Sequence, residues 1–143
     1  MAVISAAPEV AKIGKKLIGQ FHTHLNGMDI RYVFRDKATK HLGQTVQGTA
    51  SVKSGLFAML ATGSTNSEGL TVGIVTIAGD EWEKLDAAQR HRLVDHELCH
   101  LGVEITEGGG RKLVLIPHEI QEFADIWARY GLDESDAAFL ERA

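Results

Sequence analysis

Cysteine, proline and long apolar runs are scarce in this chain, and each shortage excludes a class of protein. One cysteine among 143 residues cannot form an internal disulfide, which excludes a disulfide-stabilised scaffold. Two prolines and 15 glycines exclude a proline-rich linker protein and a collagen. No apolar run approaches the roughly 20 residues that cross a bilayer, so we expect neither a transmembrane protein nor a membrane partner.

The rest of the composition is typical of one globular domain. Hydrophobic residues make up 44% of the chain and charged residues 24%. A chain of this length buries a core without crosslinks, so we predict a single domain over residues 1–143. The N-terminus lacks a basic start, and its apolar run ends at Pro8 and Glu9, which is untypical of a signal peptide. We therefore predict a cytoplasmic protein.

Charge is distributed unevenly along the chain. Residues 1–40 hold seven basic and three acidic side chains, whereas residues 81–143 hold seven basic and fourteen acidic ones. A basic first third can contact nucleic acid, although a solvated helix face explains the same pattern more simply. The basic residues proposed for such a contact are Lys12, Lys15, Lys16, Arg31 and Arg35.

Apolar residues spaced three and four apart predict the helices. One helix covers about residues 8–26, and a second covers about residues 87–102 with Asp86 as its N-cap. Pro117 opens a third helix, because proline is favoured at the first helical position. A short last helix is expected over residues 133–142.

Alternating or β-branched runs predict strands between these helices. They cover residues 30–34 and residues 70–78, the second being a well-buried strand, and a hairpin follows at residues 103–116. Residues 36–48 are predicted to form a loop or an edge strand, and residues 63–69 a loop. The resulting order, α-β-β-β-α-ββ-α, predicts a compact α+β domain with a small sheet.

The second predicted helix contains His96-Glu97-Leu98-Cys99-His100, an H-E-x-x-H motif. His96 and His100 are separated by about 40° on consecutive helical turns, so both imidazoles can reach one metal ion. Glu97 lies on the flank of the same face, where its carboxylate can act as a general base without binding the metal. This arrangement is typical of zinc hydrolases. The alternative is an amphipathic helix with two surface histidines.

A zinc site needs a third protein ligand, which must come from elsewhere in the chain. The metzincin spacing would place a histidine at position 106, where this chain has Thr106. His118, on the first turn of the third predicted helix, is the favoured ligand because imidazole suits zinc. Glu119 and Glu122 are the carboxylate alternatives, and Glu122 could instead orient His118 by a hydrogen bond.

Cys99 and the remaining histidines fit the metal site less well. Ligation by the Cys99 thiolate is conceivable, but a cysteine on an apolar helix face is more often part of the core. Four histidines have no partner at metal spacing and are expected outside the site: His22, His24, His41 and His91.

The motif and the segments around it resemble the family described as "putative phage metallopeptidase". The similarity covers about residues 28–131 and depends mostly on the two histidine segments taken together. The similar segments are Tyr32 to Asp36, the strand ending at Trp82, Val94 to Leu101, Arg111 to Leu113, Pro117 to Phe123 and Arg129 to Gly131.

This resemblance implies a small zincin fold, related to the SprT-like and minimal gluzincin groups. It implies His96, His100 and His118 as zinc ligands and Glu97 as the catalytic base. The family pattern places aspartate after the third histidine, where this chain has Glu119. SprT-like relatives act on DNA-bound proteins, which adds interest to the basic N-terminal third.

We therefore predict a zinc-dependent metallopeptidase that hydrolyses peptide bonds in a protein or peptide substrate. Strand 70–78 is a candidate edge for binding an extended substrate by strand addition. Tyr130, Arg129 and Lys53 are candidates for stabilising the tetrahedral oxyanion. The alternatives are a catalytically silent metal-binding or interaction protein and a DNA-associated SprT-like protease. The sequence leaves the oligomeric state open.

Overall fold

The computed structural model describes residues 2–117, 126, 129 and 130. These residues form a mixed α+β fold, as predicted. The elements are β1 (Ile4–Ala6), α1 (Pro8–Phe21), the 3-10 helix η1 (Thr23–Leu25), β2 (Ile30–Arg35), β3 (Thr39–His41), β4 (Gln44–Val46), β5 (Gly48–Ser54), α2 (Gly55–Thr62), β6 (Thr71–Ala78), α3 (Gly79–Trp82), α4 (Ala87–Cys99), β7 (Leu101–Ile105) and β8 (Arg111–Leu115).

The main sheet has four strands in the order β1-β2-β6-β5. β2 and β6 run parallel, with Ile30 opposite Gly73, whereas β1 and β5 are antiparallel to their neighbours. Within the described part of the chain, β6 is therefore central, and the prediction that strand 70–78 forms an edge is wrong. The physical reason lies in its composition: Val72, Val75 and Ile77 are fully buried, and burial on both faces is typical of an interior strand.

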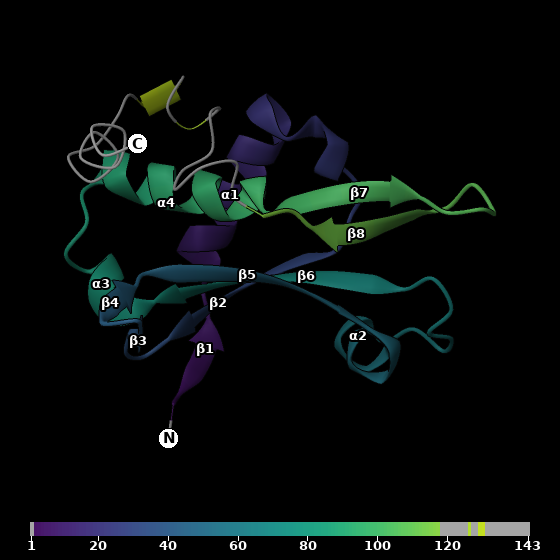
Figure 1. Cartoon of the computed structure of the whole chain (residues 1–143), viewed down its shortest axis with the longest axis horizontal. Helices are drawn as coiled ribbons and strands as arrows, with labels where there is room; N and C mark the ends of the chain where they lie inside the picture. The colour runs from purple at the N-terminus through teal and green to yellow at the C-terminus, as the bar shows by residue number, and fades with distance from the viewer. Residues whose placement is uncertain (1, 118–125, 127–128, 131–143) are drawn as a thin grey trace.

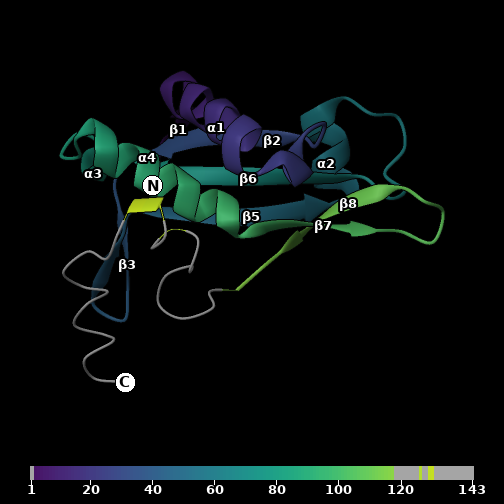
Figure 2. The same cartoon turned by 90° about the horizontal axis from the view of Figure 1, so that it is seen from above.

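Helices α1 and α4 cover one face of this sheet, and α2 lies on the opposite side (Figure 1). The β7–β8 hairpin follows α4 directly and extends over β5 and β6 from the side on which α4 packs (Figures 1 and 2). Among the described residues, no helix combines the length and the apolarity needed to cross a membrane.

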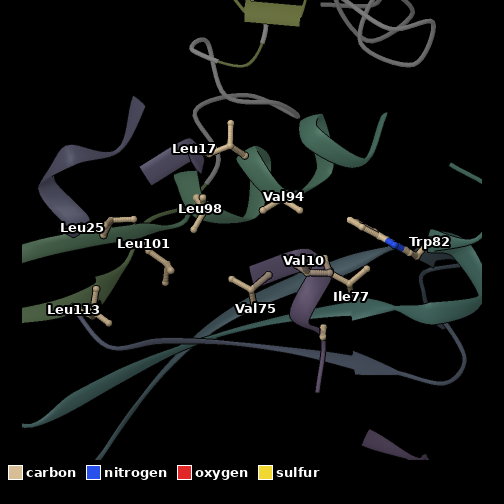
Figure 3. Packing of buried hydrophobic residues seen from close by; sticks show 11 residues of the cluster. Val10, Leu17, Leu25, Val75, Ile77, Trp82, Val94, Leu98, Leu101 and Leu113 are labelled. Carbon is tan, nitrogen blue, oxygen red and sulfur yellow. The ribbon is translucent and has the colours of Figure 1, made fainter. Parts of the chain in front are cut away.

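The hydrophobic core lies between the sheet and the two helices α1 and α4 (Figure 3). The side chains of Val75 and Ile77 point from β6 toward Val94 and Leu98 of α4, and all four are completely buried. Burying a side chain of this size stabilises the fold by about 1.5–3 kcal/mol relative to leaving it in water. This packing holds the apolar side of α4 against the sheet and leaves another side of the helix for polar residues.

Helix α4 begins at the predicted cap and ends earlier than predicted. Asp86 and Gln89 form a reciprocal capping box, in which the Asp86 carboxylate accepts from the Gln89 backbone N–H and the Gln89 amide oxygen accepts from that of Asp86. The helix stops at Cys99, because the chain turns at His100 into β7. Gly102, the second residue of β7, permits close packing against the end of the hairpin, since a Cβ there would lie 2.5 Å from Cδ1 of Ile116.

We expect Asp86→Ala to destabilise the protein by about 1 kcal/mol, because it removes the side-chain acceptor that caps α4. Thermal unfolding followed by circular dichroism should show a lower midpoint by a few degrees, the usual shift for a domain of this size. Glu83→Ala is the matched control, because that exposed carboxylate precedes α4 and is no part of the capping box of Asp86 and Gln89. An unchanged midpoint in Asp86→Ala would show that the capping box does not stabilise the helix.

Other segments differ from their predictions. The helix expected over residues 8–26 is divided, because α1 ends at Phe21 and η1 follows. Residues 36–48 contain the β3–β4 hairpin, whose turn uses Leu42 and Gly43 at positive φ, the conformation that a tight hairpin turn requires. The helix expected from Pro117 and the last helix over residues 133–142 lie outside the described residues, apart from three helical positions at Ile126, Arg129 and Tyr130.

Candidate metal centre

The H-E-x-x-H motif lies at the C-terminal end of α4. His96 and Glu97 belong to the last turn of the helix, and His100 is its C-cap with helical backbone angles of φ −74° and ψ −13°. The four-residue spacing therefore remains helical, and the two imidazole rings meet edge to face with centroids 5.3 Å apart. One side-chain ligand atom from each of His96, Glu97 and His100 lies within 4.8 Å of the other two.

His100 is oriented by the chain that returns from the hairpin. Its Nδ1 lies 2.7 Å from the carbonyl oxygen of Ile116, and the Ile116 backbone N–H donates to the His100 carbonyl over 2.6 Å. A carbonyl oxygen only accepts, so Nδ1 carries the proton and Nε2 carries the lone pair. This is the tautomer that a neutral histidine needs to bind a metal, held by a backbone partner.

Glu97 is almost fully buried, with 3% of its surface exposed. Its carboxylate lies against the first residue of β5, where a Cβ added to Gly48 would be only 3.1 Å from Oε2. Glycine at this position therefore leaves room for the carboxylate beside the sheet. No local sequence feature indicates this contact, because residues 48 and 97 are far apart in the chain.

His96 and Glu97 open into a cleft of about 720 Å³. One wall is the chain from Gln44 to Gly48, which comprises β4, Gln47 and the first residue of β5, and the other is the side of α4 that carries Arg92 and His96. Tyr130 completes the lining. His96 and Glu97 are therefore next to a space large enough for a ligand.

A second polar cluster surrounds Asp95, which is completely buried one residue before the motif. Its carboxylate accepts hydrogen bonds from His22, Arg129 and Tyr130 at 2.6–2.9 Å. His22 was predicted outside the site and lies here as a buried residue, 3% exposed, rather than as a free surface histidine. One sequence signal could have indicated the cluster. Asp95 is a charged residue directly after Val94, on the side of α4 that the apolar residues occupy.

Competing effects act on the Asp95 carboxyl group. Burial alone would raise its pKa, but the hydrogen bonds from His22, Arg129 and Tyr130 and the positive charge of Arg129 lower the pKa to about 2. The carboxylate is therefore ionised at neutral pH. Burial, together with the bond to this carboxylate, raises the pKa of the Tyr130 hydroxyl, which therefore stays protonated and donates.

Cys99 lies beside this cluster, with Sγ 3.9 Å from Nη2 of Arg129. Ligand atoms of His22, Asp95 and Cys99 also lie within 4.8 Å of one another. The Arg129 guanidinium, however, donates to both oxygens of Asp95 and supplies the positive charge there. We therefore interpret this group as an ion-pair cluster and the group of His96, Glu97 and His100 as the candidate metal centre.

The other histidines that were predicted outside the metal site make contacts of their own or are exposed. Nε2 of His24 is 3.1 Å from the Leu101 carbonyl oxygen, and Nδ1 of His91 is 2.9 Å from that of Ala87. His41 is an exposed residue of β3.

The three candidates for oxyanion stabilisation have different positions. Tyr130 borders the cleft, but its hydroxyl donates to Asp95. Arg129 donates to the same carboxylate. Lys53 is exposed on β5 and alternates with Val52, which packs on the core, so its side chain points to the other face of the sheet. Arg92 lines the cleft one helical turn before His96 and was not predicted as a site residue from the sequence.

The basic residues of the N-terminal third do not share one surface. Lys12, Lys15 and Lys16 are exposed on α1, which packs on the face of the main sheet that carries the hydrophobic core. Arg31 and Arg35 alternate along β2 with residues that pack against the core. Their side chains therefore point to the opposite face of the sheet. Nucleic-acid binding through all five stays a prediction.

The candidate third ligands, His118, Glu119 and Glu122, lie outside the described residues. The described chain on either side of them is attached to α4. Before them, Ile116 exchanges hydrogen bonds with His100, and after them, Arg129 and Tyr130 bind Asp95.

The model of one protein family, described as "putative phage metallopeptidase", matches residues 3–142 of the chain. No curated protein and no solved structure matches it.

Proposed function

This chain belongs to the putative phage metallopeptidase family, and from that membership we propose that it is a zinc-dependent peptidase acting on a protein substrate. The observation that carries the proposal is the meeting of His96, Glu97 and His100 beside a cleft of about 720 Å³. A metallopeptidase needs a metal ion held by protein side chains and a group that moves protons next to it. His96 and His100 would supply two of the metal ligands and Glu97 the group that moves protons, all at the end of one helix.

We assign His96, His100 and His118 as the zinc ligands. The His100 tautomer supports the first pair, because its Nδ1 proton is held by the Ile116 carbonyl and Nε2 remains for a metal. His118 follows Ile116 by two residues, and two steps of about 3.8 Å place its Cα within about 8 Å of that of Ile116. A nitrogen-rich ligand set suits zinc.

When bound, zinc would polarise the scissile carbonyl and activate the attacking water. Glu97 takes the proton from that water and transfers it to the leaving amine, so one carboxylate serves as base and then as acid. Its burial against β5 holds the carboxylate in one place beside His96 and His100. Because the Tyr130 hydroxyl is bound to Asp95, we propose that Tyr130 contributes its ring to the cleft wall.

We propose that an extended substrate binds along β5 and not along strand 70–78, which is the interior strand β6. Within the described residues β5 is an edge of the main sheet, and its first residue, Gly48, is next to Glu97. An extended peptide can add to such an edge through main-chain hydrogen bonds. This geometry would bring the substrate backbone past the carboxylate.

We expect purified protein to contain zinc at one ion per chain. Metal analysis after dialysis checks this, and a strong chelator should remove both the metal and the peptidase activity, with added zinc restoring them. Nickel or cobalt could occupy the same ligands during purification, so every first-row metal is measured. A chain with no metal that also takes up no zinc would contradict the site.

A further inference from the structure

The carboxylate of Asp95 joins parts of the chain that are distant in sequence. Oδ1 accepts from Nε2 of His22 and from Nη2 of Arg129, each over 2.6 Å. Oδ2 accepts from Nε of Arg129 over 2.7 Å and from the Tyr130 hydroxyl over 2.9 Å. Each oxygen therefore has two donors, and the carboxylate is completely buried. Hydrogen bonds to a charged group are the stronger class in proteins.

The end of α1 completes the enclosure of Arg129. The guanidinium carbon lies 4.3 Å from the ring centre of Phe21, the last residue of α1. His22, which follows Phe21, is the residue at which the predicted long helix is interrupted. Arg129 is thus held between an aromatic ring of α1 and a carboxylate of α4.

Tyr130 connects this cluster to the cleft. It is the described residue beyond β8 that lines the cleft together with His96 and Glu97. Its hydroxyl is directed to Asp95, so the cluster determines where the ring lies. The same helix thus presents the motif residues on one side and, through Asp95, fixes a wall of the cleft next to them.

We propose that Asp95 is a positioning residue that holds Tyr130 in the wall of the cleft, so that the Tyr130 ring contacts the bound substrate. This inference rests on the proposed peptidase function. Tyr130 is then a substrate-contacting residue, and Asp95 acts only through it. Its role concerns substrate binding, and neither zinc binding nor the proton transfer by Glu97 depends on it.

The first test compares Tyr130→Phe and Asp95→Asn with the unchanged chain. A fluorogenic peptide substrate gives kcat and KM, and competition with a chelating dye gives the zinc affinity. We expect Tyr130→Phe to raise KM by roughly three- to tenfold and Asp95→Asn to raise it by roughly tenfold or more, because a ring without its anchor occupies the cleft wall only part of the time. Zinc affinity should stay within about twofold in both, because Asp95 bonds to His22, Arg129 and Tyr130 and orients no proposed zinc ligand, whose own partners are the ones with 10- to 100-fold effects.

Asp80→Asn is the matched control, since Asp80 is an exposed carboxylate that accepts from the backbone N–H of Ala38 and is not among the residues that line the cleft. Its KM should not change. If both test variants only lower the unfolding temperature and keep KM unchanged below it, Asp95 has a purely structural role and the proposal is overturned.

The second test needs no activity. Amide hydrogen exchange, followed by NMR on the zinc-loaded protein, should be at least about tenfold faster at Tyr130 in Asp95→Asn, with Val75 of the central strand as the internal reference. Unchanged exchange at Tyr130 would overturn the anchoring even in an active enzyme. An unchanged chain that binds zinc but cleaves no peptide would instead contradict the proposed function, and this second test would still decide the anchoring.

Discussion

Replacing Glu97 by glutamine should abolish peptide hydrolysis while zinc stays bound at full stoichiometry. The amide has nearly the size of the carboxylate, so it fits the space that Gly48 leaves beside β5. It cannot accept the proton of the attacking water, however, and general acid–base catalysis contributes typically 10²–10⁴-fold. We expect kcat/KM to fall by about three orders of magnitude or more, measured on a fluorogenic peptide together with metal analysis of the same sample.

Glu83→Gln is the control for this experiment, because Glu83 is exposed just after α3. It should retain full activity and full zinc content. If Glu97→Gln kept the activity of the unchanged chain, the peptidase mechanism proposed here would be wrong. If it lost zinc together with activity, Glu97 would be a ligand rather than a base.

Replacing His118 by alanine should remove most of the zinc affinity. Two histidines on one helix hold zinc weakly, and a third protein ligand completes the usual site. The Ile116 carbonyl accepts from Nδ1 of His100, and the Ile116 N–H donates to the His100 carbonyl, so the chain reaches the motif two residues before His118. Competition with a chelating dye of known affinity measures the loss, and the circular dichroism spectrum of the variant checks its fold.

Glu122→Ala is the matched comparison. If Glu122 orients a ligand by a hydrogen bond, its loss should weaken zinc binding by only about 10- to 100-fold. A greater loss in Glu122→Ala than in His118→Ala would show a site of two histidines and one glutamate, and our assignment of His118 would be wrong. Glu119→Ala, measured in parallel, tests the remaining carboxylate.

The parts of the fold that could be predicted from the sequence are those specified by neighbouring residues. Asp86 and the apolar positions that follow it predict α4, and both are local features. β5 was missed because its sequence, Gly48–Ser54, is small and polar and is stabilised by pairing with β6. The apolar run Leu56–Leu60 lies in α2, but the sequence alone does not predict this helix, since short apolar runs fit a strand or a helix equally well. Strand order was also unreadable, because it depends on which distant segments pair.

In the candidate site, too, local features could be predicted from the sequence and contacts between distant residues could not. The three motif residues could be predicted because four-residue spacing on a helix fixes their mutual distance. The partners of Asp95 could not, since His22 and Arg129 are 73 and 34 positions away in the chain. No periodicity in a single sequence reports a contact across such separations. The buried charge at position 95 was the available hint that partners exist.

The closure of the β7–β8 hairpin at its base has a consequence for recognising relatives of this chain. Five residue pairs, from Leu101 with Leu115 to Ile105 with Arg111, separate the base from the turn at Gly108–Gly110. Residues added or removed in pairs at that turn would lengthen or shorten both strands equally and leave Ile116 next to His100. The number of residues between the motif and position 118 is thus free to drift between homologues while the spatial arrangement is kept. A search pattern with a fixed gap would miss such members, whereas one with a variable, even-numbered insertion would find them.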